Sequence, residues 1–194
     1  MKIGKIIGRV FMILFALIVL GMLLRIFMMD DKGELTVLTP TDAARAAYAE
    51  NGADAFATHK LQLRISADGY FTAHSMVYCE EAGELQITAR YNESVFEYLD
   101  VADGSDFTWE LRDADGNTVS VARVADTQEK YFYRYFRLIF DDVECGKDTE
   151  LRLYLCSPAA EYPGAETVGF PVHLKGQQWK PYSLSKPERE SLEK

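Results

Sequence analysis

The chain has 194 residues, of which 48% are hydrophobic and 12% aromatic, and its formal net charge is −9. This length suits one ordinary domain plus an appendage, because domains usually contain about 100 to 200 residues. The apolar content excludes a mostly disordered chain. Only four of the 21 basic residues precede the first acidic residue, Asp30, so the acidity is concentrated in the rest of the chain. A strongly acidic domain repels nucleic acid, and we therefore exclude nucleic-acid binding.

The first predicted element is a transmembrane helix. Residues 10–29 are apolar or glycine with one exception, Arg25. A helix of that length extends about 30 Å, which is the thickness of the hydrocarbon core of a bilayer. Arg25 lies near the outer end of the helix, where its long side chain reaches the headgroups. It is also a candidate for a contact within the membrane, with an acid on a neighbouring helix.

The flanks of this helix predict its orientation. Residues 1–9 form a basic flank, whereas Asp30 and Asp31 follow the apolar run. This asymmetry predicts a single-pass protein of the cell membrane with a cytoplasmic N-terminus and an extracytoplasmic C-terminal domain. The alternative is a cleaved signal peptide. Residues 25–31 offer no small residues at the spacing that a signal peptidase needs, which favours an uncleaved anchor.

Residues 30–57 are predicted to form a tether and one short helix. The run TDAARAAYAENG follows Pro40, with Thr41 or Asp42 as the N-cap and Gly52 as the stop. A short, alanine-rich helix is marginal by itself in water. We therefore expect it to dock on the domain, through its residues Ala44, Ala47 and Tyr48.

Residues 58–175 are predicted to form a β domain. Apolar and polar residues alternate there, as in the row Leu85, Ile87 and Ala89, and Asp115-Gly116 predicts a hairpin turn within residues 107–123. The expected strands cover residues 60–65, 70–79, 84–91, the two arms of the 107–123 hairpin, 131–140, 150–156 and 167–174. About eight short strands without a long helix between them indicate a mainly β fold, an antiparallel immunoglobulin-like sandwich, with a barrel as the second choice. The charged tail, residues 176–194, is predicted to be loosely held.

Two stretches of the predicted β domain carry a resemblance. The runs FTWELRDADGNTVSVARV and YFRLIFDDVECGKDTELRLYLC cover residues 107–124 and 135–156. They are similar to the hairpin-and-return pattern of immunoglobulin-like or telokin-like domains in membrane-anchored surface proteins of Gram-positive-type bacteria. The resemblance implies a location in the cell envelope and a binding or structural role. It brings no catalytic residues with it.

The cysteines and histidines predict no site. An exported chain with three cysteines invites a disulfide, and the pair to consider is Cys79 with Cys156. The two lie on predicted faces that disagree, and Cys145 lies in a turn, so we expect thiols. The three histidines fall on separate predicted strands without metal-ligand spacing; they are His59, His74 and His173.

No catalytic or cofactor motif is present either. The chain has neither a Gly-x-Ser-x-Gly elbow nor a Ser-x-x-Lys signature, so we expect no enzyme, although a triad of distant residues stays open. The acidic run of residues 113–117 is too short before its glycine for a calcium loop and is read as a solvated turn. Weak calcium binding by Asp141, Asp142 and Glu144 stays open as well. The prediction is therefore no cofactor and no metal.

One stripe of residues is a candidate interaction face. The side chains of Tyr131, Tyr133, Tyr135 and Arg137 alternate with a row that includes Phe132 and Phe136. If the phenylalanine row is buried, the tyrosine row points outward, and tyrosines are frequent where proteins bind proteins or sugars. The alternative, which we favour, is that the short helix or the C-terminal tail covers the stripe.

Three functions remain in order of preference. The first is a non-enzymatic, membrane-anchored binding module of the cell envelope, whose partner is an envelope protein or a glycan. The second is an accessory subunit of a membrane complex, assembled through the transmembrane helix and Arg25. The third is an envelope hydrolase in which a serine or aspartate meets His74 or His173. The sequence leaves the oligomeric state open.

Overall fold

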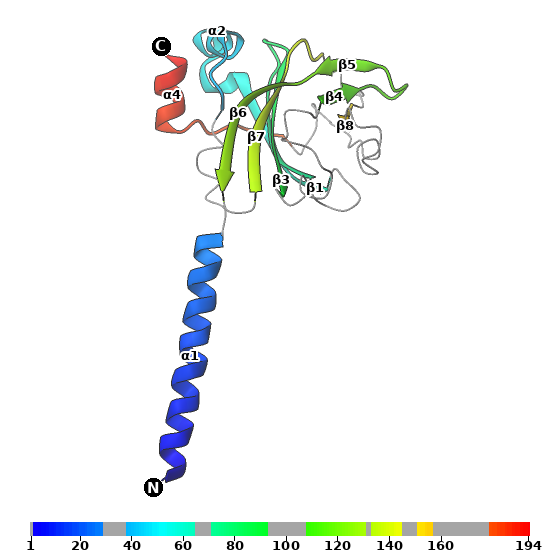
Figure 1. The fold of residues 1–194 in the computed structure, drawn as a ribbon. Helices are drawn as coiled ribbons and strands as arrows, with labels where there is room; N and C mark the ends of the chain where they lie inside the picture. Colours follow the sequence, from blue (N-terminus) through cyan, green and yellow to red (C-terminus); the bar gives the residue numbers. More distant parts are fainter. Residues whose placement is uncertain are drawn as a thin grey trace. The chain divides into compact units, whose positions relative to one another are not determined.

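The structure, a computed structural model, describes residues 2–28, 38–64, 71–92, 108–130, 133–144, 151–156 and 179–194 (Figure 1). The chain divides into two compact units, Met1–Lys32 and Gly33–Lys194.

The first unit is one helix, α1 (Lys2–Met28). Its segment Ile7–Leu24 has a mean hydropathy of 2.6, and none of it is buried. The large apolar side chains of this segment are between 37% and 74% exposed. An 18-residue helix rises about 27 Å, so α1 is long and apolar enough to cross a membrane. The predicted apolar helix is confirmed, and it begins at Lys2 instead of residue 10 because the basic flank is helical too.

The second unit is mainly β and contains two antiparallel sheets. The larger sheet has the strand order β6-β7-β3-β2-β1-β9, and the smaller one has the order β5-β4-β8. The strands are β1 (Phe56–Arg64), β2 (Phe71–Cys79), β3 (Glu84–Asn92), β4 (Thr108–Arg112), β5 (Thr118–Val121), β6 (Arg123–Lys130), β7 (Tyr133–Phe140), β8 (Arg152–Cys156) and β9 (Lys180–Pro181). The predicted mainly β, antiparallel character is confirmed. The strand predicted at residues 167–174 lies outside the described residues.

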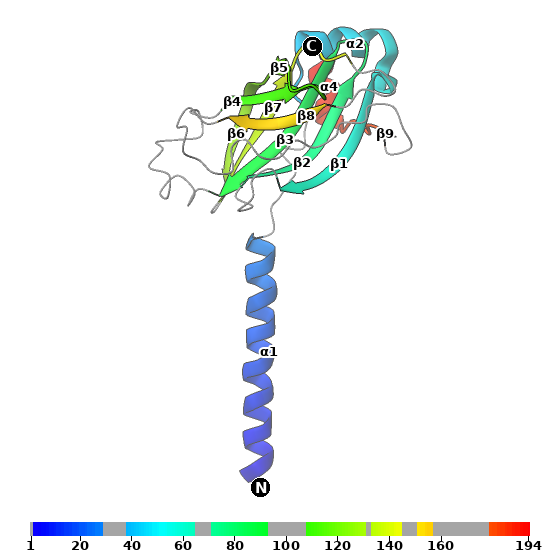
Figure 2. The ribbon, with the colours of Figure 1, turned by 90° about the vertical axis from the view of Figure 1, so that its right-hand side faces the viewer.

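The two sheets pack face to face (Figure 2). The predicted inward row of β3 is confirmed, because Leu85, Ile87 and Ala89 are all 0% exposed. From the smaller sheet, the ring of Trp109 lies 5.1 Å, centroid to centroid, from the ring of Phe136 on β7. Aromatic contacts of this kind and the burial around them supply most of the stabilisation of a two-layer core.

The hairpin of β4 and β5 forms where it was predicted. Gly116 has φ 86°, a left-handed conformation that glycine adopts without a steric penalty. The Asp113 carboxylate accepts hydrogen bonds from the backbone N–H groups of Asp115 at 3.0 Å and Asn117 at 2.8 Å. The acidic side chain at the start of residues 113–117 therefore closes the turn itself.

Strand β6 is a feature that the sequence pattern did not predict. Its sequence, RVADTQEK, has no apolar alternation. The strand lies at the edge of the larger sheet and pairs with β7. An edge strand with little burial needs no apolar row, so its sequence resembles that of a loop.

Two helices, α2 (Asp42–Asn51) and α4 (Lys186–Leu192), pack on the side of the larger sheet that points away from the smaller one (Figure 1). The first, α2 (Asp42–Asn51), begins where predicted, with the Thr41 hydroxyl accepting a hydrogen bond from the Ala44 N–H at 3.0 Å. A short 3₁₀ helix, η1 (Gly52–Ala55), follows it. The predicted docking of α2 is confirmed, because Ala44 and Ala47 are 0% and 4% exposed.

The prediction of a loosely held tail is wrong for residues 179–194, which we call the C-terminal strap. Its strand β9 pairs with β1, and its helix α4 (Lys186–Leu192) begins at a capping box with a proline in the first turn. Leu184 and Leu192 are 3% and 4% exposed. Two well-spaced leucines are enough to dock a charged segment whose average composition suggested a free tail.

The strap is held by a buried carboxylate. Glu188 is 2% exposed, and its Oε1 accepts hydrogen bonds from the Leu38 N–H at 2.8 Å and the Tyr182 hydroxyl at 2.5 Å. Its Oε2 accepts one from the Ser185 N–H at 2.5 Å. Burial favours a higher pKa for Glu188, but these hydrogen bonds outweigh it and lower the pKa below the ordinary value of 4.5. Burial and the bond to Glu188 raise the pKa of Tyr182.

The lowered pKa of Glu188 predicts a pH-dependent stability. A carboxyl whose folded pKa is depressed stabilises the fold above its unfolded pKa, and this stabilisation is lost as the pH falls through the folded pKa. We therefore expect the difference in unfolding free energy between the wild type and Glu188→Gln to be largest near pH 7 and to shrink below about pH 4. Urea titrations of both proteins from pH 7 to pH 3 measure it. A difference that stays constant with pH would show that the pKa of Glu188 is the same in the folded and unfolded states.

Candidate functional site

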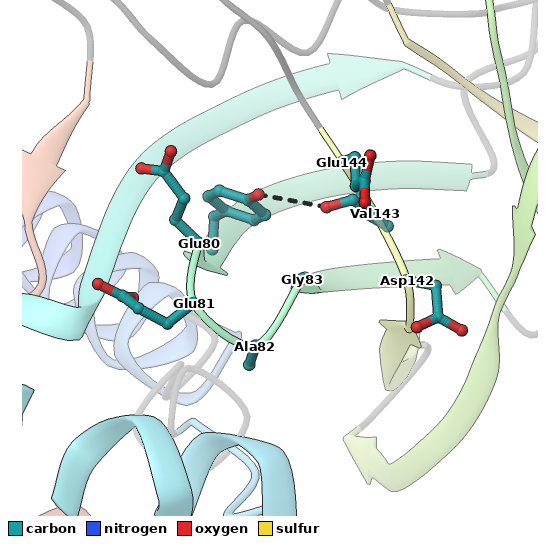
Figure 3. Close-up of a pocket in the computed structure, with 8 residues that line it drawn as sticks. Glu80, Glu81, Ala82, Gly83, Asp142, Val143 and Glu144 are labelled. Carbon is teal, nitrogen blue, oxygen red and sulfur yellow. Dashed lines mark hydrogen bonds between the residues drawn. The ribbon is translucent and has the colours of Figure 1, made fainter. Parts of the chain in front are cut away.

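A hollow of about 480 Å³ lies where two turns of the larger sheet meet. One wall is the turn between β2 and β3, and the other is the segment that follows β7 (Figure 3). The lining residues are Tyr78, Glu80, Glu81, Ala82, Gly83, Asp142, Val143 and Glu144. We call this hollow the acidic pocket.

The backbone that builds the acidic pocket is held firmly. Gly83 and Asp142 have φ 59° and 58°, so both turns reverse through the left-handed region. The Val143 N–H donates to the Gly83 carbonyl at 2.7 Å, and the Tyr78 hydroxyl donates to the Val143 carbonyl at 3.2 Å. These two bonds join the walls, and Val143 is 0% exposed beneath them.

The side chains around the pocket carry one sign of charge. Glu80, Glu81, Asp142 and Glu144 are all exposed, and among the described residues that line the pocket there is no lysine, arginine or histidine. In Figure 3 the carboxylates of Glu80 and Glu81 lie apart from those of Asp142 and Glu144 and do not converge on a point. In agreement, the described residues contain no group of three or more His, Cys, Asp or Glu side chains placed to hold a metal ion. A rim of separate carboxylates suits a partner with several positive groups better than it suits a single ion.

The predicted tyrosine stripe is not an exposed surface in the described structure. Tyr135 is 5% exposed and Arg137 1% exposed, while Tyr133 is half-buried and Tyr131 lies outside the described residues. The charge of Arg137 favours a lower pKa for Tyr182 of the C-terminal strap, so the two side chains lie near each other. Tyr135 and Arg137 are therefore buried, and Arg137 lies near the strap.

Tyr133 and Tyr135 of this stripe contact Arg90 on β3. The Arg90 guanidinium lies 4.3 Å from the ring centroid of Tyr133, and its Nη1 donates to the Tyr135 hydroxyl at 3.1 Å. Such cation–π and hydrogen-bond contacts engage the tyrosines within the larger sheet. Tyr135 therefore contributes to the packing of the larger sheet.

The remaining residues that the sequence singled out are an arginine of α1 and the cysteines and histidines of the second unit. Arg25 belongs to α1, but its side chain, like those of His59 and His74, lies outside the described part of the structure, as do Cys145 and His173. Cys79 and Cys156 form no disulfide with each other. Cys79 is buried, and burial raises the pKa of its thiol. Arg112 Nη2 lies 3.5 Å from the Cys156 sulfur.

The sequence indicated half of the acidic pocket. Asp142 and Glu144 mark an acidic turn in the sequence, but no local pattern connects this turn with Glu80 and Glu81. The sequence does show two acidic turns, each of which follows a predicted strand, and this pattern is the signal for the pocket. Only the pairing of β3 with β7, in which Leu85 faces Phe140, brings those two strand ends together.

Comparison with known proteins identifies no family. No family model matches the chain, and neither the curated proteins nor the solved structures yield a match.

Proposed function

We propose that this protein is a membrane-anchored, non-enzymatic interaction module of the cell envelope, and that its acidic pocket binds a basic segment of an envelope protein. The observation that carries the proposal is the combination of an apolar helix, whose segment Ile7–Leu24 is not buried, with a separately compact domain. Within the acidic pocket the exposed groups are carboxylates, and the Tyr78 hydroxyl is already engaged. Carboxylates on a rim attract and orient a cationic partner.

The immunoglobulin-like character of the domain is part of this proposal. Its support is the packing of two antiparallel sheets and the hairpin of β4 and β5. A sandwich of this kind presents turns at its ends, which is where related architectures carry their binding loops. The acidic pocket, formed by turns, lies at such an end.

The orientation is proposed from the flanks of α1. Lys2, Lys5 and Arg9 precede the apolar segment, and acidic residues follow it. Positive residues are retained on the cytoplasmic side. We therefore expect the C-terminal unit outside. In protoplasts of a Gram-positive host that express the full chain with a C-terminal epitope tag, added protease should remove the tag without lysis. Full protection of the tag would place the domain in the cytoplasm.

The binding surface is tested by removing its charge. We expect the quadruple variant Glu80→Gln, Glu81→Gln, Asp142→Asn and Glu144→Gln to bind a lysine-rich peptide more weakly than the wild type does. Exposed charge pairs contribute about 0.2 to 1 kcal/mol each, so the loss of four is expected to weaken binding by about 0.8 to 4 kcal/mol, which is about 4- to 800-fold, at low salt. Titrations of the full chain in nanodiscs, at low and at physiological salt, measure it.

A matched control separates the pocket from net charge. The variant Glu50→Gln, Asp54→Asn, Asp115→Asn and Glu193→Gln removes the same charge from exposed positions that do not line the pocket. It should bind like the wild type. Equal losses in the two variants would mean that only the overall acidity attracts the peptide. Capture of a glycan instead of a basic protein from envelope extracts would assign the pocket a different partner.

A further inference from the structure

The C-terminal strap covers an apolar patch on the larger sheet. Leu184 and Leu192 of the strap pack in one cluster with Phe56, Val77 and Cys79 of the sheet, and these three are 1%, 3% and 2% exposed. Alanines of α2 complete the cluster. The thiol of Cys79 is therefore buried beneath the helical layer.

The attachments of the strap are few compared with those inside the sheets. Strand β9 pairs with β1 at two positions, Ala57↔Pro181 and Thr58↔Lys180, whereas β2 and β3 pair along their whole length. Helix α4 has seven residues, and a helix of that length is unstable without its tertiary contacts. Most of its side chains face solvent.

Two further attachments of the strap lie near the start of the second unit. Glu188 accepts the Leu38 N–H at 2.8 Å, and the Arg45 Nε donates to the Ser191 carbonyl at 3.3 Å. Leu38 is the first described residue after α1 in the chain. These two bonds connect the strap to the segment before α2 and to α2 itself.

We propose that the C-terminal strap is a cover that opens as a unit while the two sheets stay folded. Opening breaks the contacts of Glu188, Leu184 and Leu192, releases Leu38, and exposes the patch of Phe56, Val77 and Cys79. Segments with few buried contacts and short ladders are those that open below the global unfolding free energy. The strap thereby controls access to this apolar face of the domain.

The chain contains residues that report separately on the strap and on the packing between the two sheets. Its two tryptophans are Trp109, 2% exposed between the sheets, and Trp179, in the strap, whose ring lies 6.4 Å from that of Tyr78. Cys79 reports on the covered patch. With Cys145→Ser and Cys156→Ser, it becomes the remaining thiol of the chain, which has three cysteines.

The experiment compares opening with global unfolding in the full chain in detergent micelles. Cys79 is labelled with a maleimide in increasing urea, while Trp179 fluorescence is followed in a Trp109→Phe background and Trp109 fluorescence in a Trp179→Phe background. We expect Cys79 labelling and the Trp179 transition to occur together at lower urea than the Trp109 transition. Coincidence of all three transitions would overturn the proposal, because the strap would then be part of one cooperative core.

Variants of the strap sharpen the result. Glu188→Gln, and Tyr182→Phe as the milder change, should each speed Cys79 labelling in the absence of urea, Glu188→Gln by about tenfold. The Trp109 transition should move little. Glu190→Gln on the same helix, where the carboxylate is exposed, should leave labelling unchanged. Labelling that rises only in proportion to a shift of the Trp109 transition would also overturn the proposal.

Discussion

Replacement of Trp109 by alanine is expected to cause a large loss of stability. Trp109 is 2% exposed, and its ring packs at 5.1 Å against Phe136 of the opposite sheet. Truncation of a buried tryptophan removes the contact between the layers and leaves a cavity, at a cost of about 3 to 5 kcal/mol. That is a large part of the roughly 5 to 15 kcal/mol that stabilises a typical domain.

The loss is measured by urea unfolding of residues 33–194, followed by circular dichroism. Val119→Ala is the matched control, because Val119 lies on β5 of the same sheet and is 39% exposed. It should change the unfolding free energy by less than about 0.5 kcal/mol. A Trp109→Ala protein that unfolds within 1 kcal/mol of the wild type, roughly the size of an average substitution effect, would contradict the packing of the sheets described above.

Gln86→Leu is expected to destabilise the domain by about 3 kcal/mol, through buried polar groups instead of packing. Gln86 is 1% exposed, and its amide accepts the Thr39 N–H at 2.9 Å and donates to the Thr39 carbonyl at 2.8 Å. It also donates to Glu84 Oε1 at 2.7 Å. Leucine fills similar space but removes this partner from three polar groups, each at a cost of about 1 kcal/mol or more.

Unfolding of the same fragment, followed by tryptophan fluorescence, measures this effect. Thr127→Leu, on the exposed edge strand β6, controls for the introduction of an apolar side chain into a strand. Because Thr39 lies beside Leu38, the variant should also loosen the start of the domain and increase proteolysis there. If Gln86→Leu is as stable as the control, the bonds between Gln86 and Thr39 do not stabilise the fold.

Several elements were predictable because their signals are local. The alternation of Leu85, Ile87 and Ala89 predicted a strand with a buried face, and Asp115-Gly116 predicted the hairpin of β4 and β5. Thr41 and Gly52 predicted the two ends of α2. Each signal depends on residues that are close together in the chain, and the period of side-chain burial follows directly from backbone geometry.

Burial on the second face of the larger sheet was not predictable in the same way. Alternation identifies one apolar face and suggests that the other is solvated, yet Glu84, Gln86 and Thr88 are 2%, 1% and 3% exposed. The Thr41 hydroxyl donates to Glu84 Oε2 at 2.6 Å, and Gln86 is bonded to Thr39, so the segment before α2 covers these two side chains. Arg137, placed on an outward face by alternation, is likewise 1% exposed.

The sequence by itself determined that this protein has an apolar helix long enough to cross a membrane and a mainly β, acidic second unit. Composition, hydropathy and two-residue periodicity suffice for these features because they act over a few neighbouring residues. Only the tertiary structure decided that Glu188 binds the Leu38 N–H, 150 residues away, and that two acidic turns share one pocket. Such contacts depend on strand order and docking, which a local pattern does not encode. The strap and the acidic pocket, the two features on which the functional proposals rest, belong to this second class.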